Sequence, residues 1–324
     1  MHAAPLSANH AALLAALRAV LPADGLLTDE PERRVYECDA LTNYRALPLA
    51  VALPDTVPQV QALLRLCNQH GVPVVPRGAG TGLSAGALPR EDGILLSMTR
   101  FDRILEIDPD NRIARVQPGV RNLAVSEAAA VHGLFYAPDP SSQFASSIGG
   151  NIAENSGGVH CVKYGLTTHN LLEVTLVTLD GELLTLGGGG LDGPGFDLLA
   201  LVTGSEGMLG VVVEARLKLL PVPESIVLLQ AAFPDWERAG RAVMDIVAAG
   251  VVPSALEMMD QVAIEVIEGY IQAGLPLDAA AVLFCELDGA VAEVEAQLDR
   301  ATEVMRACGG YDLRLARDAD ERTR

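Results

Sequence analysis

The chain has 324 residues, of which half are hydrophobic and 4% aromatic, and its formal net charge is −19. This length and composition predict a globular protein with two domains and exclude an intrinsically disordered chain. The negative charge argues against nucleic acid and anionic membrane surfaces as partners, because both select basic surfaces. No apolar run reaches the length of a membrane-spanning helix, so no transmembrane segment is expected.

Residues 1–46 are predicted to form an N-terminal helical extension. The Ala- and Leu-rich run over residues 8–20 carries Arg18 and lacks the basic leader and the cleavage site of a signal peptide, so we expect a helix there. Five cysteines are scattered along the chain without a CxxC pair. They give no support for zinc or iron–sulfur ligation and indicate a reducing cytoplasm.

A strand–helix–strand unit follows. Residues 49–53 form a short apolar run typical of a strand, and Asp55-Thr56-Val57-Pro58 combines a capping side chain with an early proline, as a helix start does. Gly71 ends that helix, and residues 72–75 form the next buried strand. This unit leads into the glycine-rich loop Pro76-Arg77-Gly78-Ala79-Gly80-Thr81-Gly82-Leu83-Ser84-Ala85-Gly86.

The glycine-rich loop over residues 76–86 is a candidate anion site. Glycine permits positive φ and close approach of a ligand to the backbone, and successive exposed N–H groups form a nest for an anion. The simplest ligand is the phosphate or pyrophosphate of a nucleotide cofactor. The loop alone is equally well explained as an ordinary turn, because it is not GxGxxG in register and no lysine follows it.

Strands dominate the rest of the first domain, and a second domain of mixed composition follows it. Before Pro223 we expect strands over 93–97, 103–108, 112–117, 171–179, 182–186 and 211–219 and a helix over 125–132. Asp180-Gly181 predicts a hairpin turn between the strands 171–179 and 182–186. After Pro223, strand-like runs over 226–232, 281–287 and 313–316 alternate with helical runs over 236–249, 261–273 and 291–307. We therefore predict three parts: the extension 1–46, a domain over 47–223 and a second α+β domain over 224–324.

Three further clusters combine glycine with small polar residues. Pro138-Asp139-Pro140-Ser141-Ser142, taken alone, is typical of a rigid loop. In residues 146–158, Ser146 or Ser147 can cap a helix that begins with a glycine pair, and so much glycine and asparagine would destabilise a purely structural element. This favours a binding role. The third cluster, residues 203–212, is also explained by a tight turn into a strand.

The order and spacing of these clusters resemble the FAD-binding fold of the vanillyl-alcohol-oxidase superfamily, also called PCMH-type. The likeness is strongest to the glycolate oxidase D subunit and to D-2-hydroxyacid and D-lactate dehydrogenases, and it covers residues 30–324. The matching stretches are 75–82, 138–142, 148–151, 160–165 and 204–207. The resemblance implies an α+β fold, with a two-subdomain FAD-binding domain followed by a partial cap domain of the FAD-linked oxidase C-terminal type.

The resemblance also implies that FAD is held without a covalent bond, although His132, His160 and His169 are alternative attachment points. The pyrophosphate would lie on the backbone of Pro76, Arg77, Gly78, Ala79, Gly80, Thr81 and Gly82, with Ser84 nearby. The pyrophosphate and flavin would be lined by Pro138, Ser142, Ser147, Gly149, Gly150 and Asn151, with Gly157 and Gly158 close to the cofactor. The adenosine end would border Glu206, Gly207, Gly210 and Val212.

The implied reaction is oxidation of a 2-hydroxy acid, such as glycolate or D-lactate, by hydride transfer to flavin N5. It requires a base for the hydroxyl proton and a cation for the carboxylate. In relatives these groups, and a histidine-bound metal, come mainly from the later half of the second domain. No catalytic residue and no metal ligand are therefore named here, and the arginines at positions 314, 317, 322 and 324 are expected to be solvated.

Two other functions remain open. One is a non-catalytic FAD-binding subunit that relays electrons within a larger complex. The other is a related flavin enzyme acting on another alcohol or on a nucleotide-linked sugar. The expected partners are a small 2-hydroxy acid and subunits that carry flavin or iron–sulfur centres. The expected location is the cytoplasm, at the membrane periphery through those subunits.

Overall fold

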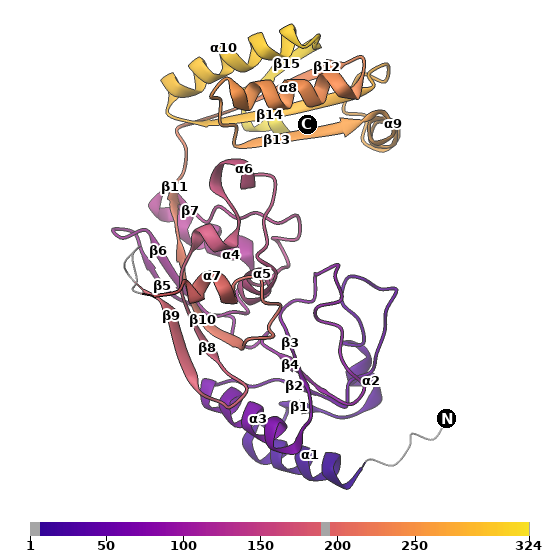
Figure 1. The fold of residues 1–324 in the computed structure, drawn as a ribbon, viewed down its shortest axis with the longest axis vertical. Coiled ribbons are helices and arrows are strands. Elements are labelled where there is room, and N and C mark those ends of the chain that lie inside the picture. Colours follow the sequence, from indigo (N-terminus) through magenta and orange to yellow (C-terminus); the bar gives the residue numbers. More distant parts are fainter. Residues whose placement is uncertain (1–6, 189–194, 324) are drawn as a thin grey trace. The chain divides into compact units, whose positions relative to one another are not determined.

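The structure, a computed structural model, describes residues 7–188 and 195–323, which fall into two compact units (Figure 1). The first unit comprises the chain up to Gly157 together with Leu166–Leu220. The second comprises Gly158–Gly165 together with the chain from Pro221 onward. Both contain helices and strands, as the predicted α+β class requires. No helix within the described ranges is long and apolar enough to cross a bilayer.

A mostly parallel sheet forms one half of the first unit. Its strands lie in the order β1 (Leu26–Leu27), β2 (Ala50–Ala52), β4 (Ile94–Ser97) and β3 (Val74–Arg77). Strands β2 and β3 both run parallel to β4. The helices of this half are α1 (Ala8–Val20), α2 (Glu30–Arg34) and α3 (Val57–His70). The predicted start of α3 is present as a capping box, in which Thr56 and Gln59 exchange hydrogen bonds.

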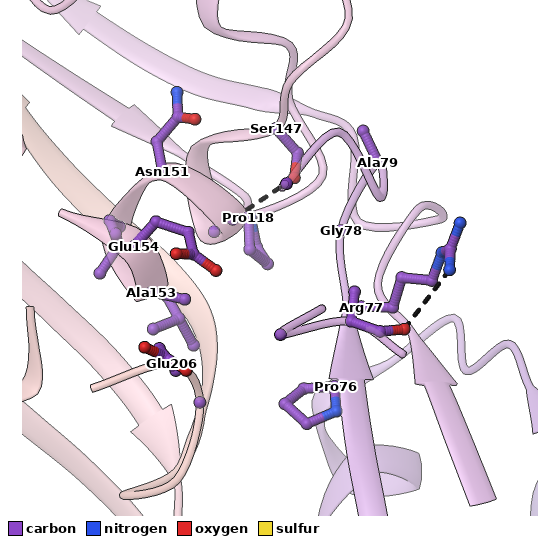
Figure 2. A pocket seen from close by; sticks show the side chains of 18 of the residues that line it. Pro76, Arg77, Gly78, Ala79, Pro118, Ser147, Asn151, Ala153, Glu154 and Glu206 are labelled. Carbon is purple, nitrogen blue, oxygen red and sulfur yellow. Dashed lines mark hydrogen bonds between the residues drawn. The ribbon is translucent and has the colours of Figure 1, made fainter. Parts of the chain in front are cut away.

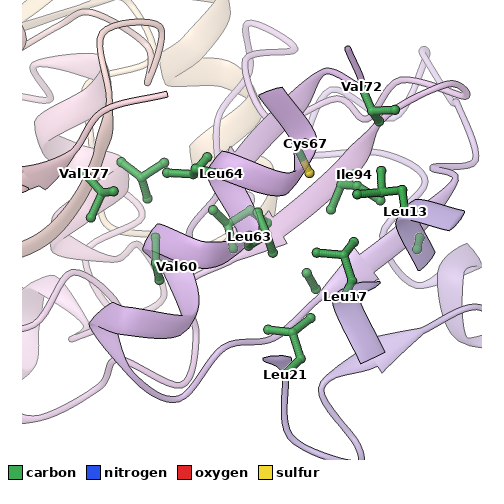
Figure 3. Close-up of a cluster of buried hydrophobic side chains, with 14 of the residues drawn as sticks. Leu13, Leu17, Leu21, Val60, Leu63, Leu64, Cys67, Val72, Ile94 and Val177 are labelled. Carbon is green, nitrogen blue, oxygen red and sulfur yellow. The ribbon is translucent and has the colours of Figure 1, made fainter. Parts of the chain in front are cut away.

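The N-terminal helix is part of the core of this half (Figure 3). Leu13 and Leu17 of α1 are fully buried and belong to the same cluster as Leu63 and Cys67 of α3 and Ile94 of β4. Burial also raises the pKa of the Cys67 thiol to about 12, so this cysteine packs as a small apolar residue. This packing was not predicted from the sequence, where residues 1–46 were expected to form a separate extension.

An antiparallel sheet forms the other half of the first unit, in the order β5-β6-β10-β8-β9. Its strands are β5 (Ile104–Asp108), β6 (Ile113–Val116), β8 (Leu171–Val177), β9 (Leu183–Gly187) and β10 (Val211–Lys218). The helices are α4 (Asn122–Ala129), η1 (Ala130–His132), α5 (Ile148–Glu154), η2 (Thr167–Asn170) and α7 (Leu198–Val202). A short pair, β7 (Leu134–Phe135) and β11 (Leu220–Pro221), completes this half.

The turn between β8 and β9 joins the two halves of the first unit. Gly181 has φ +73°, as the predicted Asp-Gly turn requires, and its carbonyl accepts hydrogen bonds from Gln61 and Arg65 of α3 at 2.8 and 2.6 Å. Asn68 of α3 donates to Asp180 at 2.9 Å. The hairpin therefore fixes the antiparallel sheet against a helix of the parallel one.

The second unit is a four-stranded antiparallel sheet in the order β13-β14-β12-β15. Its elements are β12 (Ser225–Phe233), α8 (Trp236–Ala248), β13 (Ala255–Asp260), α9 (Gln261–Tyr270), β14 (Ala281–Gly289), α10 (Val291–Ala307), β15 (Tyr311–Ala316) and α11 (Ala319–Thr323). The sequence predicted the strands of this unit except β13, and it predicted helices α8, α9 and α10. Strand β13 was missed because its buried and exposed residues do not alternate.

Strand β14 presents two chemically different faces. Ala281, Leu283, Cys285 and Leu287 are buried in one cluster with α8 and α10. The intervening residues point to the opposite face. There Val282 packs with Ile264 of α9, and further along the strand Glu286 and Asp288 place their carboxylates on the same face. Because successive side chains of a strand point to opposite faces, β14 has one apolar face and one partly charged face.

The two carboxylates on that face bind the segment Gly158–Gly165, which contains the short helix α6 (Cys161–Tyr164). Glu286 accepts hydrogen bonds from His160 and Ser254, each at 2.9 Å. Asp288, only 5% exposed, pairs with Lys163 and accepts a hydrogen bond from the Tyr164 hydroxyl at 2.6 Å. These contacts explain why residues 158–165 belong to the second unit, although both of their flanks belong to the first.

We expect Lys163→Met to lower the free energy of unfolding of the second unit by roughly 3 kcal/mol, because it leaves a buried carboxylate without its cation. Denaturant titration followed by the fluorescence of Trp236, the chain's single tryptophan, measures this change. The other lysine of the chain is the control, since Lys218 is exposed at the end of β10 and Lys218→Met should leave the transition in place. An unshifted transition for Lys163→Met would contradict the assigned pair.

Candidate functional site

A cavity of the first unit has a volume of about 300 Å³ and is lined by four segments that lie far apart in the sequence (Figure 2). They are the loop 76–87 after β3, Ser142, residues 146–156 around α5, and the stretch 202–212 that leads into β10. Met98 and Pro118 complete the wall. The cavity thus collects the four glycine-rich or hydroxyl-rich clusters of the sequence.

These segments pack closely where the backbone of a glycine meets a side chain of its neighbour. A Cβ atom on Gly78 would lie 2.1 Å from Ser147 Oγ, and one on Gly207 would lie 2.5 Å from Pro76 Cγ. Both distances are too short for any real side chain, so only glycine allows the loop after β3 to meet α5 and the loop before β10. These glycines are required for packing, in addition to any contact with a ligand.

The glycine loop offers backbone donors to the cavity. Within the described residues, no hydrogen bond is made by the backbone N–H groups of Ala79, Gly80, Thr81 and Gly82. Gly80 has φ +72°, a conformation that favours glycine. Unused N–H groups on consecutive residues are the donors from which an anion nest is built.

Helix α5 adds polar groups to the opposite wall. Ser147 caps the helix by accepting from the Gly150 N–H at 3.4 Å, as the sequence predicted. The buried amide of Asn151 donates to Asn122, which donates in turn to the Pro138 carbonyl, both at 2.8 Å. Ser146 is buried and its hydroxyl has no partner within the described residues. Because it lines the cavity, a ligand there would supply the missing hydrogen bond.

Arg77 supports the loop from behind. Its guanidinium donates to the Cys38 carbonyl at 2.7 Å, lies 5.7 Å from the Tyr36 ring centre and points away from α5 in Figure 2. Burial lowers the pKa of Arg77, and the charge of Asp39 opposes that shift. The residue therefore fixes the N-terminal segment to the end of β3.

The carboxylates of Glu154 and Glu206 also line the cavity. The N–H of Glu206 donates to the Ala153 carbonyl at 2.9 Å, which ties the loop before β10 to the end of the helix. Glu154, the last residue of α5, directs its carboxyl group toward the glycine loop (Figure 2). Burial raises the pKa of Glu154, and the charges of Glu206 and Asp39 add to the shift.

The structure brings most of the predicted cofactor residues to this one cavity. Those that line it are Pro76, Arg77, Gly78, Ala79, Gly80, Thr81, Gly82, Ser142, Ser147, Gly149, Gly150, Asn151, Glu206, Gly207, Gly210 and Val212. Those outside its lining are Ser84, Pro138, Gly157 and Gly158. Pro138 acts through its carbonyl contact with Asn122, and Gly158 belongs to the second unit. The candidate attachment residues His132, His160 and His169 also lie outside the lining.

The sequence analysis missed several lining residues, of which Glu154 and Ser146 carry chemistry. Glu154 could have been found by helical spacing, because it lies four positions after Gly150 on α5. Met98 and Pro118 gave no local signal, since each simply follows a strand, β4 or β6, and belongs to none of the four clusters. Residues 7–188 and 195–323 hold no group of three or more His, Cys, Asp or Glu arranged for a metal ion.

Comparison with known proteins agrees with this picture. The model of the FAD binding domain matches residues 48–187, and that of the FAD linked oxidases' C-terminal domain matches residues 222–324. Glycolate oxidase subunit GlcD of Escherichia coli K12 is 56% identical over 316 residues, which are 98% of this chain and 63% of that protein. The D-lactate dehydrogenase of Anaerostipes hadrus is 32% identical over 280 residues, 84% of this chain and 59% of that protein.

The fold is also found among solved structures. Alkyldihydroxyacetonephosphate synthase superimposes with a TM-score of 0.84 at 20% identity, covering 99% of this chain and 67% of that one. The chain spans about three fifths of the length of the curated relatives it matches. These matches confirm the predicted FAD-binding fold and FAD as the cofactor.

We expect Gly82→Asp to weaken FAD binding at least about tenfold, because it places a negative charge beside the loop that would hold the diphosphate. Position 82 is suitable because the only neighbour of a new Cβ would be Glu154 Oε1, at 3.9 Å. Gly80 is less suitable, since its Cβ would lie 2.3 Å from Arg77 Nη2. Fluorescence titration with FAD measures the effect.

The control is Gly269→Asp on α9, where a Cβ would meet nothing within 4 Å and the added charge is the same. This variant should bind FAD like the unmodified chain. Equal affinity of all three proteins would remove the glycine loop from the site.

Proposed function

Because the chain belongs to the family of FAD-linked oxidases of the vanillyl-alcohol-oxidase type, we propose that it binds FAD in the cavity of the first unit and serves the oxidation of a small 2-hydroxy acid. The observation that carries this proposal is the convergence of four side-chain-poor segments on one cavity of about 300 Å³. Such a cavity suits a ligand that is recognised through backbone groups.

The residues present fit the cofactor. The unused N–H groups of residues 79–82 suit the diphosphate, and the unpartnered hydroxyl of Ser146 needs a ligand atom. Ser142, Ser147, Gly149, Gly150 and Asn151 would line the diphosphate and the flavin, and Glu206, Gly207, Gly210 and Val212 would border the adenosine end. When bound, FAD supplies the hydride acceptor for the substrate carbon.

The role of this chain is to hold and orient the cofactor. At Gly78 and Gly207 a neighbouring side chain occupies the position of a Cβ atom, so only backbone atoms of these two residues line the cavity. The buried Asn151–Asn122–Pro138 chain of hydrogen bonds fixes the wall behind α5. Because this wall is already ordered, binding a ligand costs little further conformational entropy of the protein. The proposal assigns no proton acceptor and no metal ligand to this chain.

The substrate class follows from the relatives. Proteins with this sequence pattern carry the names glycolate oxidase subunit and D-lactate dehydrogenase, and glycolate and D-lactate are both 2-hydroxy acids. Oxidation would give the 2-oxo acid. Because the first of these relatives is a subunit, we also propose that the chain works with partner subunits carrying flavin or iron–sulfur centres, in the cytoplasm or bound through them to the membrane periphery.

A role as an FAD-binding subunit that relays electrons is the second candidate. The arginines near the end of the described chain are already engaged within the second unit. Arg314 donates to the Gly274 carbonyl at 2.7 Å, Arg317 pairs with Glu295, and Arg322 donates to the Ile226 carbonyl at 3.0 Å. Their contacts are those of structural residues, which favours the relay over direct substrate binding by these side chains. Arg324, also named from the sequence, lies outside the described residues.

We expect the purified chain to be yellow, to show a flavin absorption spectrum and to release FAD on denaturation. Under anaerobic conditions, D-lactate or glycolate should bleach the visible flavin band, and L-lactate is the stereochemical control. Bleaching by a chemical reductant alone would favour the relay. A colourless chain that cannot be reconstituted with FAD would overturn both functions.

A further inference from the structure

The cavity has an unusual charge for a site that accepts a diphosphate. Among the described residues that line it, the ionisable side chains are Arg77, Glu154 and Glu206. The guanidinium of Arg77 is committed to the Cys38 and Ala87 carbonyls at 2.7 and 3.4 Å and lies beside Asp39. Its donors are therefore engaged behind the loop, while two carboxylates line the space that the ligand would fill.

Glu154 is the carboxylate that reaches the glycine loop. A Cβ atom on Gly86 would lie 2.9 Å from Glu154 Oε1, and one on Gly82 would lie 3.9 Å from the same oxygen. The carboxyl group forms no hydrogen bond or ion pair within the described part of the chain. Its side chain is exposed to the cavity, so a ligand on the loop would cover it.

Among the described residues, the charges that raise the pKa of Glu154 are both negative. They are Glu206, which lines the same cavity from the loop before β10, and Asp39, which belongs to the N-terminal segment that Arg77 holds. Together with partial burial, these charges already raise the pKa of Glu154. A diphosphate on the neighbouring loop would add further negative charge and remove water, and both changes favour the neutral acid.

We propose that Glu154 is a further cofactor-contacting residue, which takes up a proton from solvent as FAD binds and donates the resulting carboxyl O–H to a diphosphate oxygen. This inference rests on the proposed FAD site. The step converts a carboxylate into a carboxylic acid and forms one O–H···O hydrogen bond, with no other bond made or broken. It turns a repulsive contact into an attractive one, since a neutral acid is a donor while a carboxylate only accepts.

The linkage has a definite sign. The pKa of Glu154 is higher in the complex than in the free protein, so binding is strongest below the free value. Affinity then falls by up to about tenfold per pH unit as the pH rises between the two values, and it levels off above the higher one. Glu154→Gln removes the titration and keeps a hydrogen-bond donor at the same position.

Calorimetric titration of the FAD-free chain with FAD, in two buffers of different ionisation enthalpy, counts the protons taken up. We expect close to one proton per FAD for the unmodified chain at about neutral pH and none for Glu154→Gln. At about pH 9 the variant should bind FAD at least about tenfold more tightly than the unmodified chain. Riboflavin, which lacks the diphosphate, should bind without proton uptake in both proteins.

Two further variants complete the test. Glu91→Gln, at an exposed glutamate outside the cavity lining, should keep the full proton uptake. Glu206→Gln removes a neighbouring charge and should lower the pH at which the affinity falls, so it tests the linkage even if Glu154→Gln does not fold. FAD binding without proton uptake, or equal pH dependence with riboflavin, would overturn this inference alone. Absence of FAD binding at every pH would overturn the proposed function and this inference with it.

Discussion

The first unit depends on contacts that are too close for a side chain. Gly78 meets Ser147 and Gly207 meets Pro76 at distances where even one methyl group would overlap its neighbour. Because packed interiors yield little to added volume, a Cβ at either position would push a segment outward and open the wall. The wall at these two places is therefore glycine backbone packed against a neighbouring side chain, and its shape follows from where Cβ atoms are missing.

The same constraint explains how a chain of net charge −19 can hold an anionic cofactor. A loop without side chains exposes its N–H dipoles, which act at contact distance and are not cancelled by distant carboxylates in salt-containing water. Lysine and arginine are then unnecessary in the wall. Arg77, the arginine among its described residues, instead binds the N-terminal segment through the Cys38 carbonyl. At the proposed site, local dipoles would decide binding, while the overall charge governs solubility and long-range encounters.

The sequence predicted elements wherever a local pattern was clear. The capped helix after Thr56, the Asp180-Gly181 hairpin and the amphipathic helices α8 and α10 each carry their signal within a few turns. The glycine clusters predicted that four segments meet, because glycine in excess is costly unless something requires it.

Features set by distant partners could not be predicted in this way. Leu13 of α1 is an ordinary apolar residue until α3 and β4 are placed beside it. Glu154 can be identified as a cavity residue only from its position beside Gly82 and Gly86, which lie on another segment. Strand β13 lacks alternation of its own and is defined by its pairing with β14. In each case the feature depends on tertiary contacts between distant segments, and these contacts cannot be predicted from the local pattern of a single sequence.

The grouping of residues 158–165 with the second unit has a consequence for how the protein is assembled. The second unit is discontinuous, and the Lys163–Asp288 contact spans 125 positions of the chain. Closing so large a loop is slow in comparison with local contacts. On the ribosome, the segment emerges well before the strand that receives it, so His160, Lys163 and Tyr164 stay without these partners until β14 has been made. A cut between Leu220 and Pro221 would place residues 158–165 on one fragment and their partners on the other, where Asp288 would lack Lys163 and Tyr164 and Glu286 would keep Ser254 but lack His160.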